Sequence, residues 1–101
     1  MAFEKHCWAE IDLDALEHNF RQIHRHVGGP VCAVIKADGY GHGALAVADA
    51  LHEAGAAAFA VSCLAEARQL REHGITEPIL ILGYTDPAFA GELAVPHITQ
   101  T

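Results

Sequence analysis

The chain has 101 residues and a formal net charge of −7, with six lysines and arginines against thirteen aspartates and glutamates. This charge excludes a nucleic-acid-binding protein, because contacts with phosphates need clustered positive charge. The same deficit argues against binding to an anionic membrane surface. A hydrophobic content of 51% is sufficient for a packed core, so we expect a soluble, acidic protein.

The first residues show no targeting segment. Met1–Leu13 contains four charged side chains and therefore lacks the apolar centre of a signal peptide. No apolar run in the chain is long enough to span a membrane. The cysteines, Cys7, Cys32 and Cys63, are odd in number and widely spaced, which is typical of reduced thiols. We predict a cytoplasmic protein.

The first predicted elements are a strand and a helix. Trp8–Leu13 alternates between apolar and polar residues, which favours a short strand. Asp14 and Glu17 then have the spacing of a capping box. Apolar residues at helical spacing follow, at Leu16, Phe20, Ile23 and Val27. Gly28-Gly29-Pro30 predicts the end of this helix.

The rest of the chain alternates between apolar strands and helices. The predicted strands are Val31–Ile35, Ala57–Cys63, Ile79–Leu82 and His97–Thr101, and the helices are Ala44–Ala54, Leu64–His73 and Pro87–Ala94, the last capped by Asp86. Strands that are apolar on both faces are typical of a parallel sheet between layers. The pattern predicts an α/β fold without a domain boundary inside residues 1–101.

The number of β/α units leaves two architectures open. An eight-stranded barrel needs about 250 residues, so about four units would make the first half of one. Periodicity alone does not separate this half barrel from a small open sheet.

Lys36 is the most informative residue. It follows the buried strand Val31–Ile35, and the carboxyl ends of such strands are where α/β active sites are built. Desolvation there would favour a neutral amine that can act as nucleophile or base. The alternative is a lysine that only ends the strand and reaches solvent.

The segment after Lys36 favours the functional interpretation. Residues 37–43 contain Gly39, Gly41 and Gly43 around Tyr40 and His42, and a predicted helix follows. Glycines allow positive φ and a close approach of the backbone to a ligand. Backbone amides at a helix start favour an anion such as phosphate. For His42 we expect a hydrogen-bonded position in the loop.

The other histidines do not indicate a metal site. His18, His24, His26, His52 and His73 lack the i, i+4 spacing with a helper carboxylate that marks helical zinc sites, and the chain has no Cys-x-x-Cys. We expect these side chains to be solvated and predict no metal.

Several stretches of the chain resemble the alanine racemase family. They are Trp8–Leu16, which resembles the opening of these enzymes; Ala33–Gly43, which resembles their cofactor-lysine signature; and Phe59–Ser62 with Glu66-Ala67, Pro78–Gly83 and Thr99–Thr101, which are similar to later stretches in the same order. The lysine signature is highly specific and the others are supporting. One departure is Gly39, where the family more often has alanine.

The resemblance implies the N-terminal part, about four β/α units, of a (β/α)8 TIM-type barrel that carries pyridoxal 5'-phosphate. It also implies a β-rich C-terminal domain, a homodimer, and interconversion of L-alanine and D-alanine for cell-wall precursors.

The resemblance further implies roles for three residues. Lys36 forms the Schiff base with the cofactor and serves as one of two catalytic bases. Tyr40 contacts the cofactor phosphate, and Leu82 packs near the cofactor ring, for which a plain core position is an equal alternative. The second base, a tyrosine of the partner subunit, and most other cofactor ligands would lie beyond Thr101. We therefore expect the 101 residues alone to be inactive.

Three alternatives remain at this point. A serine or broader amino-acid racemase of the same fold would share these residues. A pyridoxal-phosphate decarboxylase with a related barrel is disfavoured, because its lysine motif lacks the Gly39–Gly43 pattern. A non-catalytic fragment or cofactor-binding module belongs to a different class.

The barrel interpretation makes a geometric prediction. Residues two apart in a strand share a face, so Cys32, Val34 and Lys36 should point one way, while Ala33 and Ile35 point to the covering helices. The strands on either side of the first crossover should pair in parallel.

Overall fold

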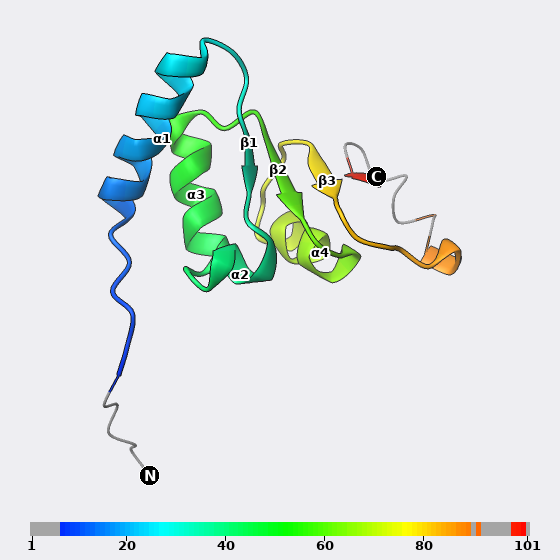
Figure 1. Cartoon of the computed structure of the whole chain (residues 1–101). Helices are drawn as coiled ribbons and strands as arrows, with labels where there is room; N and C mark the ends of the chain where they lie inside the picture. The colour runs from blue at the N-terminus through cyan, green and yellow to red at the C-terminus, as the bar shows by residue number, and fades with distance from the viewer. Residues whose placement is uncertain (1–6, 90, 92–97, 101) are drawn as a thin grey trace.

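A computed structural model of the chain describes residues 7–89, 91 and 98–100, the last three by their backbone (Figure 1). The elements are α1 (Leu13–Val27), β1 (Cys32–Val34), α2 (Lys36–Tyr40), α3 (Ala44–Ala54), β2 (Ala58–Val61), α4 (Leu64–Glu72), β3 (Ile79–Ile81), the 3-10 turn η1 (Pro87–Phe89) and β4 (Ile98–Gln100). From α1 onward the predicted alternation of helices and strands is confirmed for the described residues, except that the turn after β3 is 3-10 and not α-helix.

The four strands form one parallel sheet in the order β1-β2-β3-β4. Val34 of β1 pairs with Ala60 of β2, and Val61 pairs with Ile81 of β3, so the carboxyl ends of the three strands lie close together. In a barrel each new strand joins the previous one, whereas a doubly wound sheet reverses direction after its first strands. The sequential order therefore identifies the sheet as part of a barrel wall rather than a doubly wound sheet.

The hydrophobic core lies between one face of this sheet and the helices. Strand residues of this face are buried in one cluster with α3 and α4: Ala33, Ile35, Phe59, Val61, Ile79 and Ile81. Cys32 and Val34 point to the opposite face and are exposed. The predicted alternation along β1 is confirmed for these residues, and in a closed barrel their face would be the interior.

The helices pack as their apolar spacing predicts, with one exception in α1. Four predicted residues of α3 and three of α4 are buried: Val47, Ala48, Leu51, Ala54, Leu64, Ala67 and Leu70. In α1, Phe20 is buried, but Ile23 and Val27 are 55% and 59% exposed. Because α1 packs against α3 and not flat on the sheet, only part of its apolar stripe reaches the core.

The predicted strand at Trp8–Leu13 is wrong. Residues 7–12 have no regular structure and run away from the body of the molecule (Figure 1). A strand needs the hydrogen bonds of a neighbour, and the described strands offer this segment none. The predicted N-cap at Asp14 is also wrong: Asp12 has extended backbone angles and its carboxylate accepts from the Ala15 amide at 3.0 Å, so α1 begins earlier.

The remaining differences concern the ends of elements. The strands are shorter than predicted, although the Ala57 and Leu82 amides continue the sheet's hydrogen bonding by donating to Val31 and Val61. Asp86 caps the turn after β3 by accepting from the Ala88 amide at 2.9 Å, but this turn is the 3-10 turn η1 and not α-helix. The rest of the predicted helix, at 90 and 92–94, and the strand ends at 97 and 101 lie outside the described residues.

Candidate functional site at the carboxyl edge of the sheet

Lys36 lies at the carboxyl edge of the sheet, as predicted. β1 ends at Val34, the Ile35 amide still donates to the Ala60 carbonyl at 2.9 Å, and the half-buried Lys36 opens α2. In parallel α/β folds this edge is where ligands bind.

The residues after Lys36 form a left-handed turn. Ala37, Asp38, Gly39 and Tyr40 have φ between 52° and 64°. The turn is held by i to i−4 hydrogen bonds, from Gly39 to Ile35 at 2.8 Å and from Gly41 to Ala37 at 3.0 Å. Glycines were expected to have positive φ, but the same angle at three non-glycine residues was not. Each of those three costs about 1–2 kcal/mol, and such strain is concentrated at functional sites.

Asp38 joins this turn to α3. Its carboxylate accepts from the Ala44 amide at 2.8 Å, and its carbonyl accepts from the Gly43 amide at 2.8 Å. The start of α3, which the sequence suggested as an anion site, is therefore already bound by a carboxylate of the chain. Gly39 is buried beside it, and a Cβ there would meet Ala44 and the Val47 side chain at 3.6–3.7 Å, which is ordinary contact. An alanine here would therefore fit the space, at the cost of a side chain at a φ of +64°.

Glu66 joins the same turn to α4. One carboxylate oxygen accepts from the Ala37 amide at 2.8 Å, and the other accepts from the amide and hydroxyl of Ser62 at 2.6 and 2.5 Å. Partial burial raises the pKa of Glu66, but the hydrogen bonds from Ser62 and from the amides of Ala37 and Asp38 outweigh it and bring the pKa below its usual value. Glu66 is therefore ionised at neutral pH.

Sequence reasoning gave Glu66 no role, because its partner at Ala37 is 29 residues away. The available signal was local: a glutamate in the first turn of a helix that directly follows a buried strand.

Tyr40 and Leu82 lie at the same edge of the sheet. Tyr40 is 60% exposed at the end of α2, and Leu82 is 40% exposed directly after β3, where its amide donates to the Val61 carbonyl at 2.8 Å. Large apolar side chains left exposed at a sheet edge are available to a ligand. His42 occupies the hydrogen-bonded loop position expected for it, with Nδ1 3.4 Å from the Tyr40 carbonyl oxygen.

Gly83 brings the ends of β2 and β3 close together. Its amide donates to the Ser62 carbonyl at 3.0 Å, and a Cβ at this position would lie only 2.3 Å from that oxygen. Only glycine therefore allows this approach, and Ser62 is the residue whose amide and hydroxyl bind Glu66.

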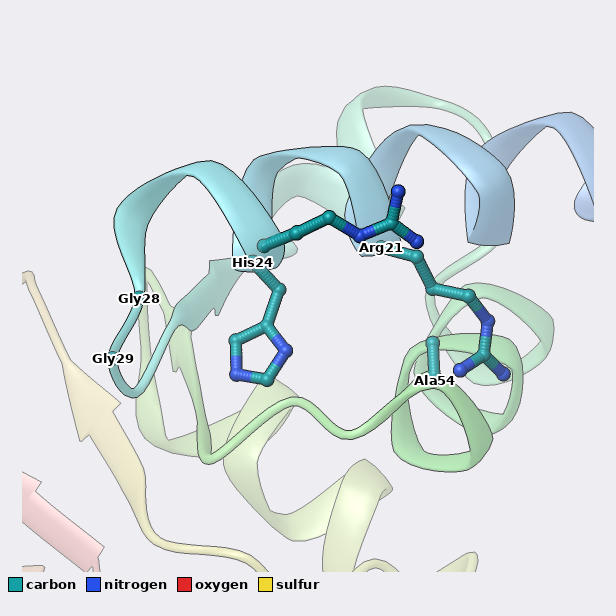
Figure 2. A pocket seen from close by; sticks show the side chains of 6 residues that line it. Arg21, His24, Gly28, Gly29 and Ala54 are labelled. Carbon is teal, nitrogen blue, oxygen red and sulfur yellow. The ribbon is translucent and has the colours of Figure 1, made fainter.

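Two of the pockets formed by the described residues lie at opposite ends of the sheet. One of about 300 Å³ is lined mainly by apolar residues, among them Val34 and Val47, and Gly39, Tyr40 and His42 border it from the left-handed turn and the loop after it. A larger pocket, of about 480 Å³, is lined by Arg21, His24 and Arg25 among other residues (Figure 2). It lies where α1 and α3 end, and the glycines that line it precede β1, so it is at the opposite end of the sheet from Lys36.

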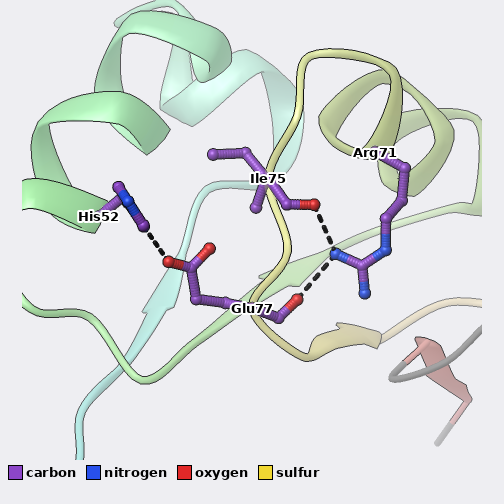
Figure 3. Close-up of polar contacts among 4 residues, drawn as sticks. All are labelled: His52, Arg71, Ile75 and Glu77. Carbon is purple, nitrogen blue, oxygen red and sulfur yellow. Dashed lines mark hydrogen bonds and ion pairs between the residues drawn. The ribbon is translucent and has the colours of Figure 1, made fainter.

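A polar cluster also lies at that opposite end (Figure 3). His52 Nδ1 binds the Glu77 carboxylate, and the Arg71 guanidinium donates to the carbonyls of Ile75 and Glu77 at 2.9 and 2.8 Å. The hydrogen bond that His52 makes to the Glu77 carboxylate, and the negative charge of that carboxylate, raise the pKa of His52. These contacts tie α3 and α4 to the segment that leads into β3.

Over the described part of the chain, no three His, Cys, Asp or Glu side chains gather as a metal site would require. Within the same residues no helix combines the length and the apolar character needed to cross a membrane.

Comparisons with known proteins place this geometry in context. The family model described as "Alanine racemase, N-terminal domain" matches residues 11–101. The alanine racemase of Desulfovibrio desulfuricans is 50% identical over 103 residues, which cover all of this chain and 28% of that protein.

Solved structures agree with these sequence matches. The alanine racemase of Bacillus anthracis with bound L-Ala-P superposes with a TM-score of 0.89 at 38% identity, over the whole of this chain and 27% of that one. A histidine racemase from Leuconostoc mesenteroides superposes with a TM-score of 0.79 at 36% identity, over 87% of this chain and 24% of that one. The chain thus spans about a quarter of the length of these proteins.

Proposed function

Because the chain belongs to the family of alanine racemase N-terminal domains, we propose that it provides the cofactor lysine of a pyridoxal-phosphate-dependent racemase that interconverts L-alanine and D-alanine. The observation that carries this proposal is Lys36, half-buried at the carboxyl edge of a parallel sheet and followed by a strained left-handed turn. A lysine that merely ended a strand would need neither the strain nor the two carboxylates that hold the turn.

The chemistry of this edge fits pyridoxal 5'-phosphate. The cofactor needs an amine to hold it covalently, and Lys36 is one of two lysines in the chain, the other being Lys5. Its ring and phosphate need apolar and hydroxyl groups, which the exposed Leu82 supplies directly after β3 and the exposed Tyr40 from the turn after β1. When bound, the cofactor acts as an electron sink for the α-carbon of an amino acid.

The residues of the chain would then have separate tasks. Lys36 holds the cofactor through Nζ and moves a proton at one face of the substrate α-carbon. Tyr40 binds the phosphate through its hydroxyl, and Leu82 packs against the ring and excludes water from that side. A second base is needed for the other face, and we place it on a partner subunit of a homodimer.

Alanine is the substrate that we propose, because relatives that are 50% identical to the chain are named for it. Serine is the alternative from the sequence, and the likeness to a histidine racemase shows that the name of one relative does not fix the side chain. Assays of racemisation with L-alanine, L-serine and L-histidine, each monitored by the loss of optical activity, separate the three substrates.

We further propose a cytoplasmic location, in keeping with three free cysteines, and inactivity of residues 1–101 alone.

The decisive test is the site of covalent attachment. In protein expressed from the complete gene, borohydride reduction in the presence of pyridoxal phosphate should fix the cofactor on the peptide with Lys36, and Lys36→Ala should abolish this label. Lys5→Ala is the matched control within residues 1–101 and should leave the labelling unchanged. Label that stays on the protein after Lys36→Ala would refute the assignment.

The different-class alternative, a non-catalytic cofactor-binding module, predicts labelling at Lys36 without racemisation of any of the three amino acids.

A further inference from the structure

The carboxylate of Glu66 connects two consecutive β/α units at the carboxyl edge of the sheet. It belongs to the first turn of α4, yet one of its oxygens accepts from the Ala37 amide, at 2.8 Å, in the unit before. Ala37 directly follows Lys36, so this hydrogen bond fixes the peptide group next to the proposed cofactor lysine.

The left-handed turn needs such an acceptor. The first amides of any helical turn have no partner four residues earlier, and in α2 the Ala37 amide is one of them. An amide bound to an ionised carboxylate makes a hydrogen bond about twice as strong as a neutral one. Glu66 thereby offsets part of the cost of φ near +52° and +56° at Ala37 and Asp38.

A simple helix-capping role would use only half of this carboxylate. The oxygen that binds the Ser62 amide and hydroxyl ties α4 to the residue that precedes its N-cap, Cys63. The other oxygen contributes nothing to α4, because its partner Ala37 belongs to the Lys36 turn. The two oxygens thus have separable tasks, one in α4 and one at the site.

We propose that Glu66 is a positioning residue for Lys36: its carboxylate holds the left-handed turn in place and so fixes where the lysine amine lies at the sheet edge. This inference rests on the proposed function, because it assigns Lys36 the task of holding the cofactor. Glu66 itself would touch neither cofactor nor substrate.

Two substitutions separate positioning from helix capping. Glu66→Asp keeps the charge and can still bind Ser62, but it is one methylene shorter and cannot reach the Ala37 amide as well. Glu66→Gln keeps the length and replaces one acceptor by an NH2 group, so one backbone amide must face a donor. The matched control is Glu77→Gln, the same chemical change at the opposite end of the sheet (Figure 3).

The experiment uses protein expressed from the complete gene, first without cofactor. Three quantities are measured: hydrogen exchange of the Ala37 amide, the rate at which Lys36 reacts with a small amine-reactive reagent, followed by peptide mapping, and the rate at which added pyridoxal phosphate is captured. We expect both Glu66 variants to lose protection from exchange at the Ala37 amide. We also expect them to capture the cofactor at least about tenfold more slowly than the unaltered protein, since a displacement of a reacting group by about 1 Å can lower a reaction rate about a hundredfold. In the loaded protein kcat should fall more than KM rises.

Glu77→Gln should leave exchange at Ala37 and capture at Lys36 within about twofold, even where it lowers stability. Equal behaviour of Glu66→Asp and Glu77→Gln in exchange and capture would overturn the proposal. If Glu66→Gln does not fold, Glu66→Asp decides alone. If Lys36 of the unaltered protein captures no cofactor, the proposed function fails, while Ala37 exchange and the amine reagent still test the positioning.

Discussion

Replacing Gly83 by alanine would place a methyl group against the backbone of the neighbouring strand end. The new Cβ would lie 2.3 Å from the Ser62 carbonyl oxygen, whereas ordinary contacts begin near 3.4 Å, so the two segments must separate by about 1 Å. The oxygen belongs to the backbone and cannot rotate away. Overpacking of this kind costs about 1–3 kcal/mol, and weakening the 3.0 Å hydrogen bond between the Gly83 amide and Ser62 adds about 0.5–1.5 kcal/mol.

We therefore expect Gly83→Ala to lower the free energy of unfolding by about 2–4 kcal/mol, out of the 5–15 kcal/mol typical of a native protein. Urea unfolding followed by circular dichroism measures the change. The control is Gly29→Ala, where φ is ordinary and no atom lies within 4 Å of the added methyl, so that stability should stay constant or rise by up to about 1 kcal/mol. Equal unfolding midpoints for the two variants would show that the close approach at Ser62 does not constrain the fold.

Two further predictions concern the core and the polar cluster. Phe59 is fully buried between the sheet and the helices, so Phe59→Ala should cost about 3–5 kcal/mol in urea unfolding, whereas a cost below about 1 kcal/mol would contradict its central place in the core. The raised pKa of His52 means that its protonation stabilises the folded chain below about pH 6.5, and this contribution is lost as the pH rises through the raised value. The difference in Tm between the unaltered protein and His52→Gln should shrink from about pH 6 to about pH 8.5, and a constant difference would refute the role of the His52–Glu77 pair.

Much of the fold could be predicted because its elements are encoded locally. Continuous apolar runs bounded by glycine and proline marked β1, β2 and β3, and helical spacing marked the buried faces of α3 and α4. The parallel alternation followed from these, and the sequential strand order then selected a barrel wall. Local patterns suffice where burial on one face decides the conformation.

The wrong predictions concern segments whose structure depends on a partner. Trp8–Leu13 alternates like a strand, but alternation describes only which side chains share a face, and no neighbouring strand bonds to this segment among the described residues. The shift of the α1 N-cap from Asp14 to Asp12 has a different reason. Either carboxylate could cap a helix, and the extended backbone at Asp12 decides between them.

The site likewise has features that a local pattern predicts and features that it does not. The lysine and the glycines, and their place at a strand end, were predictable from a short motif. The left-handed conformation of Ala37, Asp38 and Tyr40 was not, because single non-glycine residues disfavour it and only their surroundings can compensate. Those surroundings include Glu66, whose distance along the chain hides it from any local pattern.

The arrangement around Lys36 explains how a strained turn can persist at the edge of an open sheet. Asp38 binds the start of α3 within its own β/α unit, and Glu66, in the first turn of α4, joins the turn to the next unit. Ser62 in turn links that glutamate to Gly83 after β3, so the turn is connected directly or indirectly to three units and cannot relax alone. If Lys36 holds the cofactor as proposed, it benefits from such support, because the accuracy of its placement then derives from the whole sheet edge and not from the flexibility of one loop.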